Sequence, residues 1–391
     1  MSQSVSLKPL SKTALEVPFS GIRRFFDIAA SMQDVVSLGV GEPDFATPWS
    51  VREAAIYSLE RGQTTYTSNY GLLELRREIA RYLNKRYSVE YNPDSEILVT
   101  VGVSEGLDLA MRVLLNPGDE VLVPEPCYVS YKPCVALAGG VPVSVETRSD
   151  AKFAVTADQL KAACTAKTKA VLLGYPSNPT GAVLSRERIV EIIAFARDRG
   201  LYVISDEIYD RLTYDGIHTC VASVPGARDI TILLNGFSKA HAMTGWRIGY
   251  ACAPEHILKM MMKLHSYTML CAPITGQVAA LEALKHAENE VENMVAHYKQ
   301  RRRLIVDGLN KLGLTCHMPL GAFYAFPSIE STGLTAEQFA ERLLMEERVA
   351  VVPGTAFGAG GNGHVRCSYA TSVERIEVAL ARMKKFMDKL S

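Results

Sequence analysis

The sequence predicts an α/β fold, with a large domain built on a mostly parallel seven-stranded sheet and a smaller α+β domain after it. Between about residues 96 and 250, short runs rich in Val, Ile and Leu alternate with amphipathic helical stretches, as in a parallel sheet covered by helices on both faces. Gly, Pro, Asp or Asn residues bound each run and favour turns there. The predicted strands are Ile97–Val101, Val121–Pro124, Pro142–Val145, Ala170–Gly174, Tyr202–Ser205, Ile232–Asn235 and Ile248–Ala251.

The pattern changes around Gly276 to a long helical stretch that reaches Leu312 and would join two lobes. Beyond it, strand-like and helix-like runs are interleaved, which indicates an α+β layout. These runs are Ala322–Phe326, Ala336–Glu346, Ala350–Val352, His364–Tyr369 and Val373–Lys389. We therefore predict an N-terminal segment (1–48) that packs with the small domain, a large domain (49–289) and a small C-terminal domain (290–391).

Composition narrows the class of protein. The 391 residues include 42 Lys plus Arg and 42 Asp plus Glu, so the net charge is zero, which argues against nucleic acid or an anionic membrane as the main partner. Residues 1–16 lack the continuous apolar stretch of a signal peptide or a transmembrane helix. The eight cysteines form no Cys-x-x-Cys pair, so they read as reduced core residues and no metal site is expected. The expected location is the cytoplasm.

A lysine on a loop is the first candidate for chemistry. Lys239 and Arg247 lie between two predicted strands, at the sheet edge where α/β proteins bind ligands. Lys239 can form an imine with an aldehyde cofactor, and Arg247 can hold a phosphate through its fork of donors. Taken alone, this motif is better explained by a solvated lysine and an ion-paired arginine. The functional interpretation of Lys239 and Arg247 therefore depends on agreement with other motifs.

Two further strands end in matching polar groups. Asp206 ends a buried strand and Tyr209 follows three residues later, about one helical turn. Asp206 can keep a pyridinium nitrogen protonated, and Tyr209 can donate to the ring oxygen beside the imine. Asn178 follows another apolar strand and can share that oxygen. A helix-capping Asp, a packing Tyr and a bare turn at Asn178 are the alternatives.

Three other motifs complete the predicted site. Val103 and Ser104 lie where a strand passes through glycine into a helix predicted over Leu107–Leu115, so their amides, with the Ser238 hydroxyl, can bind an anion. Tyr128 follows another strand and can stack on an aromatic ring. Arg366, on a strand of the second lobe, can bind a carboxylate through two donors. Helix capping, core packing and a surface ion pair are the respective alternatives.

Together these residues resemble the class I/II aminotransferases of the fold-type I pyridoxal 5′-phosphate (PLP) enzymes, essentially from end to end. The matching motifs are Gly41-Glu42-Pro43-Asp44-Phe45, Thr65-Tyr66-Thr67, Ser177-Asn178-Pro179-Thr180-Gly181, Ser205-Asp206-Glu207-Ile208-Tyr209, Ser238-Lys239 through Arg247, Gly321-Ala322-Phe323-Tyr324 and Arg366. The chain is most similar to the bacterial branch with aspartate, aromatic and N-acetyl-diaminopimelate aminotransferases, through Ser20-Gly21-Ile22-Arg23-Arg24-Phe25 and Met243-Thr244-Gly245-Trp246-Arg247.

The resemblance implies a role for each residue. Lys239 would be the Schiff-base lysine and Asp206 the partner of the pyridine nitrogen. Tyr209 and Asn178 would bind the ring oxygen, and Tyr128 would stack on the ring. The phosphate would be bound by Val103, Ser104, Ser238 and Arg247. The substrate would be bound by Gly41, Asn178 and Arg366. Tyr66 would reach the phosphate of a neighbouring subunit, which implies a homodimer with shared active sites. The Asn178–Pro179 bond would be cis.

The resemblance also implies a reaction. An L-amino acid, with aspartate or aromatic types favoured, would give its amino group to a 2-oxo acid such as 2-oxoglutarate in a ping-pong sequence. Many relatives carry serine where this chain has Gly236, so one phosphate hydroxyl would be missing. The alternatives are an N-acetyl-LL-diaminopimelate aminotransferase, a PLP-dependent carbon–sulfur β-lyase and a non-catalytic PLP-fold sensor.

Overall fold

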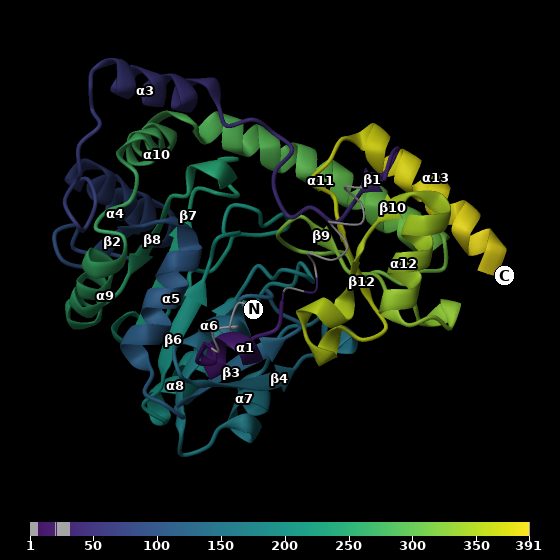
Figure 1. The fold of residues 1–391 in the computed structure, drawn as a ribbon, viewed down its shortest axis with the longest axis horizontal. Helices are drawn as coiled ribbons and strands as arrows, with labels where there is room; N and C mark the ends of the chain where they lie inside the picture. Colours follow the sequence, from purple (N-terminus) through teal and green to yellow (C-terminus); the bar gives the residue numbers. More distant parts are fainter. Residues whose placement is uncertain (1–6, 20, 22–31, 391) are drawn as a thin grey trace, which may run out of the picture.

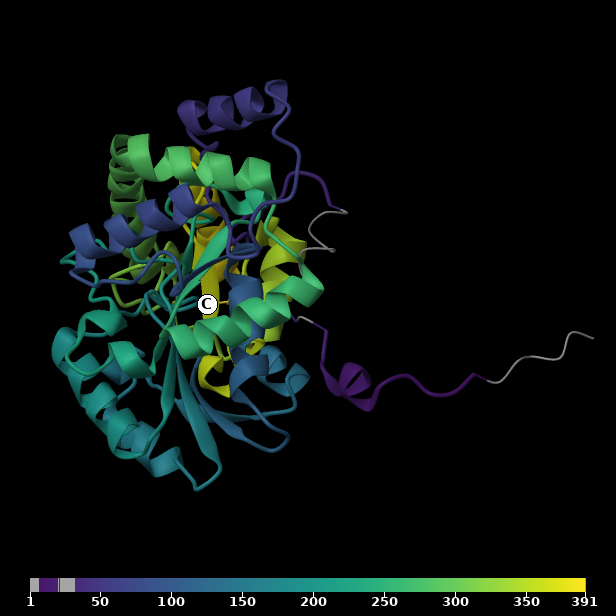
Figure 2. The same ribbon diagram turned by 90° about the vertical axis from the view of Figure 1, so that its left-hand side faces the viewer.

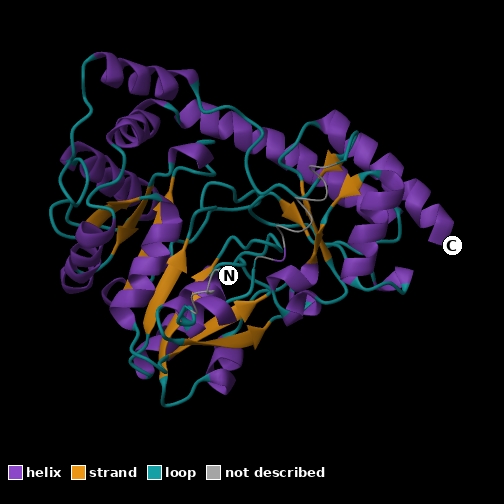
Figure 3. Ribbon diagram, in the orientation of Figure 1, coloured by secondary structure: helices purple, strands orange, loops and turns teal. Residues whose placement is uncertain are grey.

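The structure is a computed structural model that describes residues 7–19, 21 and 32–390. The chain forms two lobes joined by a long helix, and the larger lobe is built from residues between Trp49 and His286 (Figure 1). In the larger lobe a sheet lies between helices (Figure 3). Its strands are β2 (Ile97–Thr100), β3 (Glu120–Glu125), β4 (Val141–Glu146), β5 (Thr168–Gly174), β6 (Tyr202–Asp206), β7 (Thr231–Gly236) and β8 (Gly249–Cys252).

These strands form one seven-stranded sheet in the order β2-β8-β7-β6-β5-β3-β4. The pairs β7–β6, β6–β5, β5–β3 and β3–β4 are parallel, whereas β8 runs antiparallel to both β2 and β7. The predicted mostly parallel sheet is confirmed, and every predicted strand is present with ends shifted by at most two residues.

Helices cover both faces of the sheet. The helices of this lobe are α3 (Trp49–Glu60), α4 (Leu73–Tyr87), α5 (Gly102–Leu114), α6 (Tyr131–Leu137), α7 (Ala157–Ala163), α8 (Arg186–Asp198), α9 (Glu255–Thr268) and α10 (Ile274–His286). Leu172 and Ile204 pack in the core beneath α5, α6 and α9, while their strand neighbours Val171 and Val203 pack on the opposite face with α7 and α8. Burial on both faces explains why these strands read as continuous apolar runs.

The smaller lobe is built on α11 (Glu288–Lys311), α12 (Ala336–Glu347) and α13 (Val373–Leu390). They pack on a three-stranded sheet of β11 (Val352–Pro353), β12 (Val365–Ser368) and β9 (Tyr324–Ala325), and on the parallel pair of β1 (Val36–Ser37) with β10 (Val349–Ala350). Through β1, residues near the N-terminus join the smaller lobe.

The predicted single helical stretch from Gly276 to Leu312 is wrong in one respect. It breaks at Ala287, which caps the end of α10 and the start of α11. Residues of α10 pack into the core with α4, whereas α11 packs in the core of the smaller lobe. The break therefore lets two helices follow two different lobes.

The boundaries of the three predicted segments, 1–48, 49–289 and 290–391, stay a prediction. Part of the first segment lies outside the described residues, as does most of the motif Ser20-Gly21-Ile22-Arg23-Arg24-Phe25. Residues 7–17, which contain the short helix α1 (Lys12–Glu16), run out to one side of the rest of the described chain (Figure 2). No helix in the described part combines the length and apolar character needed to cross a bilayer.

Candidate active site

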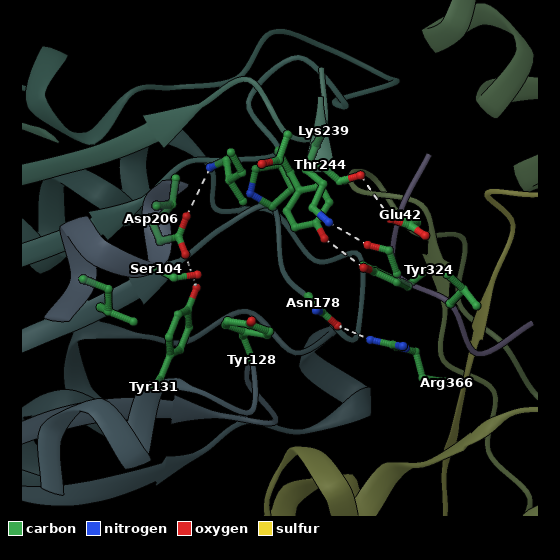
Figure 4. A pocket seen from close by; sticks show the side chains of 18 of the residues that line it. Glu42, Ser104, Tyr128, Tyr131, Asn178, Asp206, Lys239, Thr244, Tyr324 and Arg366 are labelled. Carbon is green, nitrogen blue, oxygen red and sulfur yellow. Dashed lines mark hydrogen bonds between the residues drawn. The ribbon is translucent and has the colours of Figure 1, made fainter. Parts of the chain in front are cut away.

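A cavity of about 510 Å³ lies between the carboxyl ends of the parallel strands and the smaller lobe. Side chains from both lobes point into it (Figure 4). It is lined by Val40, Gly41, Glu42, Val103, Ser104, Leu107, Tyr128, Tyr131, Pro176, Asn178, Asp206, Ile208, Tyr209, Ser238, Lys239, Thr244, Arg247, Tyr324 and Arg366. Ligands bind at this edge in open α/β sheets because the strand-end loops converge there.

Lys239 lies three residues beyond the end of β7, on the turn that leads to β8. Its Nζ donates a 2.6 Å hydrogen bond to the carbonyl oxygen of Gly41 and lies 5.7 Å from the ring centroid of Tyr209. Burial, together with the positive charge of Arg366, lowers the pKa of Lys239 to about 8. A neutral amine, the form that attacks an aldehyde, is therefore accessible near neutral pH.

Asp206 ends β6 and is buried. It accepts hydrogen bonds from the Tyr131 hydroxyl (2.9 Å) and the Ile208 backbone N–H (3.2 Å). Burial raises the pKa of Asp206 to about 6, and the Tyr131 hydrogen bond opposes this rise. No Lys, Arg or His among the described residues forms an ion pair with this carboxylate. A buried carboxylate in this position suits a ligand that brings its own N–H⁺.

Arg366 lies on β12 and reaches the cavity from the smaller lobe. Its guanidinium donates to Asn178 Oδ1 (2.9 Å) and to the Gly39 carbonyl oxygen (2.5 Å). Its buried Nε has no partner among the described residues. The ring of Tyr324 lies 4.5 Å from the guanidinium carbon, and the Tyr324 hydroxyl is 2.8 Å from that of Tyr209. Arg366 is thus held rigidly and keeps donor capacity for a carboxylate.

Val103, Ser104, Ser238 and Arg247 all line the cavity. Helix α5 begins at Gly102, five residues before the predicted start, so Val103 and Ser104 belong to a first turn whose N–H groups lack partners within the helix. Gly102 has φ +73°, and a Cβ there would lie 2.7 Å from Nη2 of Arg247. Glycine therefore lets the backbone approach the arginine, which forms an anion-binding corner.

The predicted residues come together at this cavity with one exception. Tyr66 does not line it and is 81% exposed, and its expected role toward a neighbouring subunit stays a prediction. Asn178–Pro179 is cis, as expected. The capping alternative for Ser104 is wrong, because the residue lies inside α5 and Val101 occupies the N-cap.

Eight residues that line the cavity had received no role from the sequence, and four of them have polar side chains: Tyr131, Tyr324, Glu42 and Thr244. Tyr131 follows Tyr128 at a helical spacing, and the rings meet edge to face with centroids 5.5 Å apart. Tyr324 and Glu42 stand inside motifs already noted. Glu42 accepts a 3.0 Å hydrogen bond from Thr244 across 202 positions of sequence, a contact for which the sequence carries no local signal.

Comparison with known proteins decides the family. The family "Aminotransferase class I and II" matches residues 33–383. The chain belongs to this family. It is 55% identical to the putative aminotransferase YugH of Bacillus subtilis, over 97% of this chain and 98% of that protein. It is 47% identical to an aspartate aminotransferase of Pyrococcus abyssi, over 94% and 95% of the two chains. The solved aromatic aminotransferase of Pyrococcus horikoshii superposes with a TM-score of 0.90 at 44% identity, over 95% and 100% of the chains.

This aminotransferase is an enzyme that uses pyridoxal 5′-phosphate, the cofactor of its family. The cavity fits that group. A buried lysine amine suits the aldehyde, the uncompensated carboxylate of Asp206 suits the pyridine N–H, and the corner at Gly102 and Arg247 suits the phosphate. The individual roles of these residues stay predictions.

Proposed function

We propose that this aminotransferase moves the α-amino group of an aspartate-type or aromatic L-amino acid to a 2-oxo acid such as 2-oxoglutarate in a ping-pong sequence. The single observation that carries the proposal is the placement of Arg366 opposite Lys239 in one cavity. An amino acid whose α-carboxylate binds Arg366 presents its amino group and α-carbon toward the lysine. The names of the relatives, which include aspartate and aromatic enzymes, support these two substrate types.

When bound, pyridoxal phosphate supplies an electrophilic aldehyde carbon and an aromatic ring that withdraws electrons. Lys239 would bind the aldehyde carbon, leave it when the substrate amine arrives, and then carry the proton between the substrate α-carbon and that carbon. Asp206 would accept the pyridine N–H and keep the ring protonated. Tyr131, which donates to Asp206, would hold the carboxylate in place.

The remaining cavity residues would orient the cofactor and the substrate. Tyr209 and Asn178 would donate to the ring oxygen, and Tyr128 would stack on the ring. The phosphate would be bound by Val103, Ser104, Ser238 and Arg247. Gly41 would contact the substrate, and its carbonyl oxygen, which accepts from Lys239, would hold the amine whenever Lys239 is not bonded to the cofactor. Two N–H groups of Arg366 that donate to the substrate carboxylate would fix the position of the α-carbon relative to Lys239.

We also propose a homodimer, located in the cytoplasm, in which Tyr66 completes the neighbour's phosphate site. Tyr66 and Trp49 are strongly exposed for aromatic residues (81% and 59%), and so is Tyr267 (83%). The segment that carries Tyr66 is tied to the end of α9 by a 2.7 Å hydrogen bond from Asn69 to the Leu270 carbonyl oxygen. The outlying residues 7–17 expose Leu7, Leu10 and Leu15. Exposed apolar surface of this kind favours contact with a second chain.

The test is a spectroscopic titration of the purified protein with PLP, followed by a panel of L-amino acids and then 2-oxoglutarate. We expect aspartate or an aromatic amino acid to abolish the visible band of the lysine-bound cofactor, and 2-oxoglutarate to restore it. Lys239→Ala should form no such band, whereas the exposed-site control Lys152→Ala should behave like wild type.

The rival functions predict other outcomes in the same experiment. Release of pyruvate and ammonia from cystathionine would identify a β-lyase. Conversion only by N-acetyl-LL-diaminopimelate would identify the dedicated enzyme. A band that no amino acid alters would identify a sensor and overturn the proposal.

A further inference from the structure

A buried carboxylate lies directly behind the corner proposed for the phosphate. Glu105 belongs to the first turn of α5, one residue after Ser104, but it does not line the cavity. Its Oε2 accepts a 2.5 Å hydrogen bond from the backbone N–H of Val101, the N-cap residue of α5. The side chain therefore ties the first turn of the helix back to the end of β2, across Val103 and Ser104, which line the cavity.

The other carboxylate oxygen of Glu105 is held by a second helix. His265, in the last turn of α9, places Nδ1 2.5 Å from Oε1 of Glu105. The His265 side chain is fully buried, and that of Glu105 is 8% exposed. Nε2 of His265 is buried without a partner among the described residues. The imidazole therefore makes one polar contact there, and that contact is with Glu105.

Glu105 and His265 together have two effects on the turn from Val101 to Ser104. Gly102 has φ +73° and α5 has no side-chain cap, so neither a cap nor ordinary backbone preference fixes the turn. In addition, a carboxylate this close to bound phosphate would repel the phosphate if it turned toward the cavity. The two hydrogen bonds hold Glu105 on the side of α9, which fixes the turn and keeps the negative charge away from the anion.

We infer that Glu105 and His265 are positioning residues, which hold the Val101–Ser104 turn in the geometry that binds the cofactor phosphate. The inference rests on the proposed role of Val103 and Ser104 in phosphate binding. Neither residue touches the cofactor. Their effect should therefore appear in the part of the affinity that comes from the phosphate and should be absent from the part that comes from the ring and the aldehyde.

The experiment measures that part as a ratio. Cofactor-free protein is titrated with PLP and with pyridoxal, which lacks the phosphate. The dissociation constant of pyridoxal divided by that of PLP reports how much the phosphate contributes to the affinity. Glu105→Ala and Glu105→Gln both remove the charge, but only alanine removes the acceptor for Val101. Likewise His265→Leu removes the donor at Nδ1, whereas His265→Asn keeps a donor near that position.

We expect the ratio to fall about three- to tenfold in Glu105→Ala relative to Glu105→Gln, because only a neutral hydrogen bond to Val101 separates these two variants. It should fall about tenfold in His265→Leu relative to His265→Asn, because the leucine variant loses the donor to the Glu105 carboxylate. Leu258→Ala is the matched control, since Leu258 is buried on the same helix α9 and takes no part in the pair. It should lower the melting temperature without changing the ratio.

The outcomes separate this inference from the proposed function. If wild type binds PLP no more tightly than pyridoxal, the phosphate corner itself is misassigned. If wild type prefers PLP and all four variants keep that preference, or if Leu258→Ala loses it equally, the corner stands and the positioning role of Glu105 and His265 is overturned.

Discussion

Gly236 and Gly249 face each other across the antiparallel strands β7 and β8, so closely that a Cβ on Gly236 would lie 2.8 Å from the Cα of Gly249. A Cβ on Gly249 would in turn lie 2.6 Å from the backbone nitrogen of Val103. The two glycines therefore let β7, β8 and the phosphate corner pack backbone to backbone. The absence of a serine hydroxyl at position 236 is part of this close packing.

Gly236→Ser should consequently destabilise the protein instead of adding a phosphate contact. Overpacking of this kind costs about 1–3 kcal/mol, so the melting temperature should fall and PLP affinity should not rise. Gly245→Ser is the control, since a Cβ there meets nothing within 4 Å. Thermal unfolding with and without PLP checks the prediction. A Gly236→Ser protein that is as stable as wild type and binds PLP more tightly would contradict it.

Asp206 should lower the stability of the cofactor-free protein above pH 6. Burial raises the pKa of Asp206 to about 6, whereas an unfolded Asp titrates near pH 4. Between these values the folded state binds a proton that the unfolded state has released, so stability falls as the pH rises through this window. Above about pH 6 the ionised Asp206 lowers the free energy of unfolding by its full amount, roughly 1–3 kcal/mol.

Asp206→Asn removes this cost. The cofactor-free variant should therefore be more stable than cofactor-free wild type at pH 7.5, and about equal to it near pH 4. With PLP the order should reverse, because the variant loses the partner of the pyridine N–H. Chemical denaturation at the two pH values, with and without PLP, measures both effects. Equal stability of the cofactor-free proteins at pH 7.5 would count against a strained Asp206.

The rate at which cofactor-free protein combines with PLP should rise with pH through about 8. Burial, Arg366 and Arg247 lower the pKa of Lys239 to this value, while Glu42 opposes them. The neutral amine reacts, so the rate grows as Lys239 loses its proton. Arg366→Met should move the midpoint to higher pH and Glu42→Gln to lower pH. Stopped-flow absorbance between pH 6 and 10 gives the midpoints, and shifts of the opposite sign would refute the assignment.

The fold was predictable from the sequence where burial alone determines which residues a segment contains. The central strands of the large sheet are buried on both faces, so they stand out as continuous apolar runs such as Ala170–Gly174, whereas the edge strand β4 is largely exposed. The start of α5 was not predictable from periodicity. Its first turn, Gly102 to Glu105, lacks a capping side chain, and its backbone is held by a side chain that reaches back from Glu105. The expectation of a start at Leu107 followed the apolar residues and missed that turn.

The site was predictable where a polar residue follows a strand, as at Asp206, Asn178 and Lys239. Contacts between the lobes leave no such signal. Arg366 and Asn178 are separated by 188 positions, and Lys239 and Gly41 by 198, yet each pair is hydrogen-bonded. Tyr131 was missed for a related reason: its hydroxyl meets Asp206 75 positions away, and a tyrosine at the start of a helix reads locally as ordinary packing.

Arg366→Lys should weaken substrate binding much more than it alters the cofactor. Lysine keeps the positive charge but cannot offer two parallel donors to a carboxylate, and it loses the bonds to Asn178 and Gly39. We expect kcat/KM for amino acids to fall about 10- to 100-fold, as hydrogen bonds to charged groups contribute about 1.5–3 kcal/mol. Most of the loss should appear as a higher KM. An amine without a carboxylate is the control substrate, and its slow reaction should change little, because Arg366 has no group to bind there. If both substrates lose activity equally, Arg366 acts through Lys239 or Asn178, and the carboxylate-binding role fails.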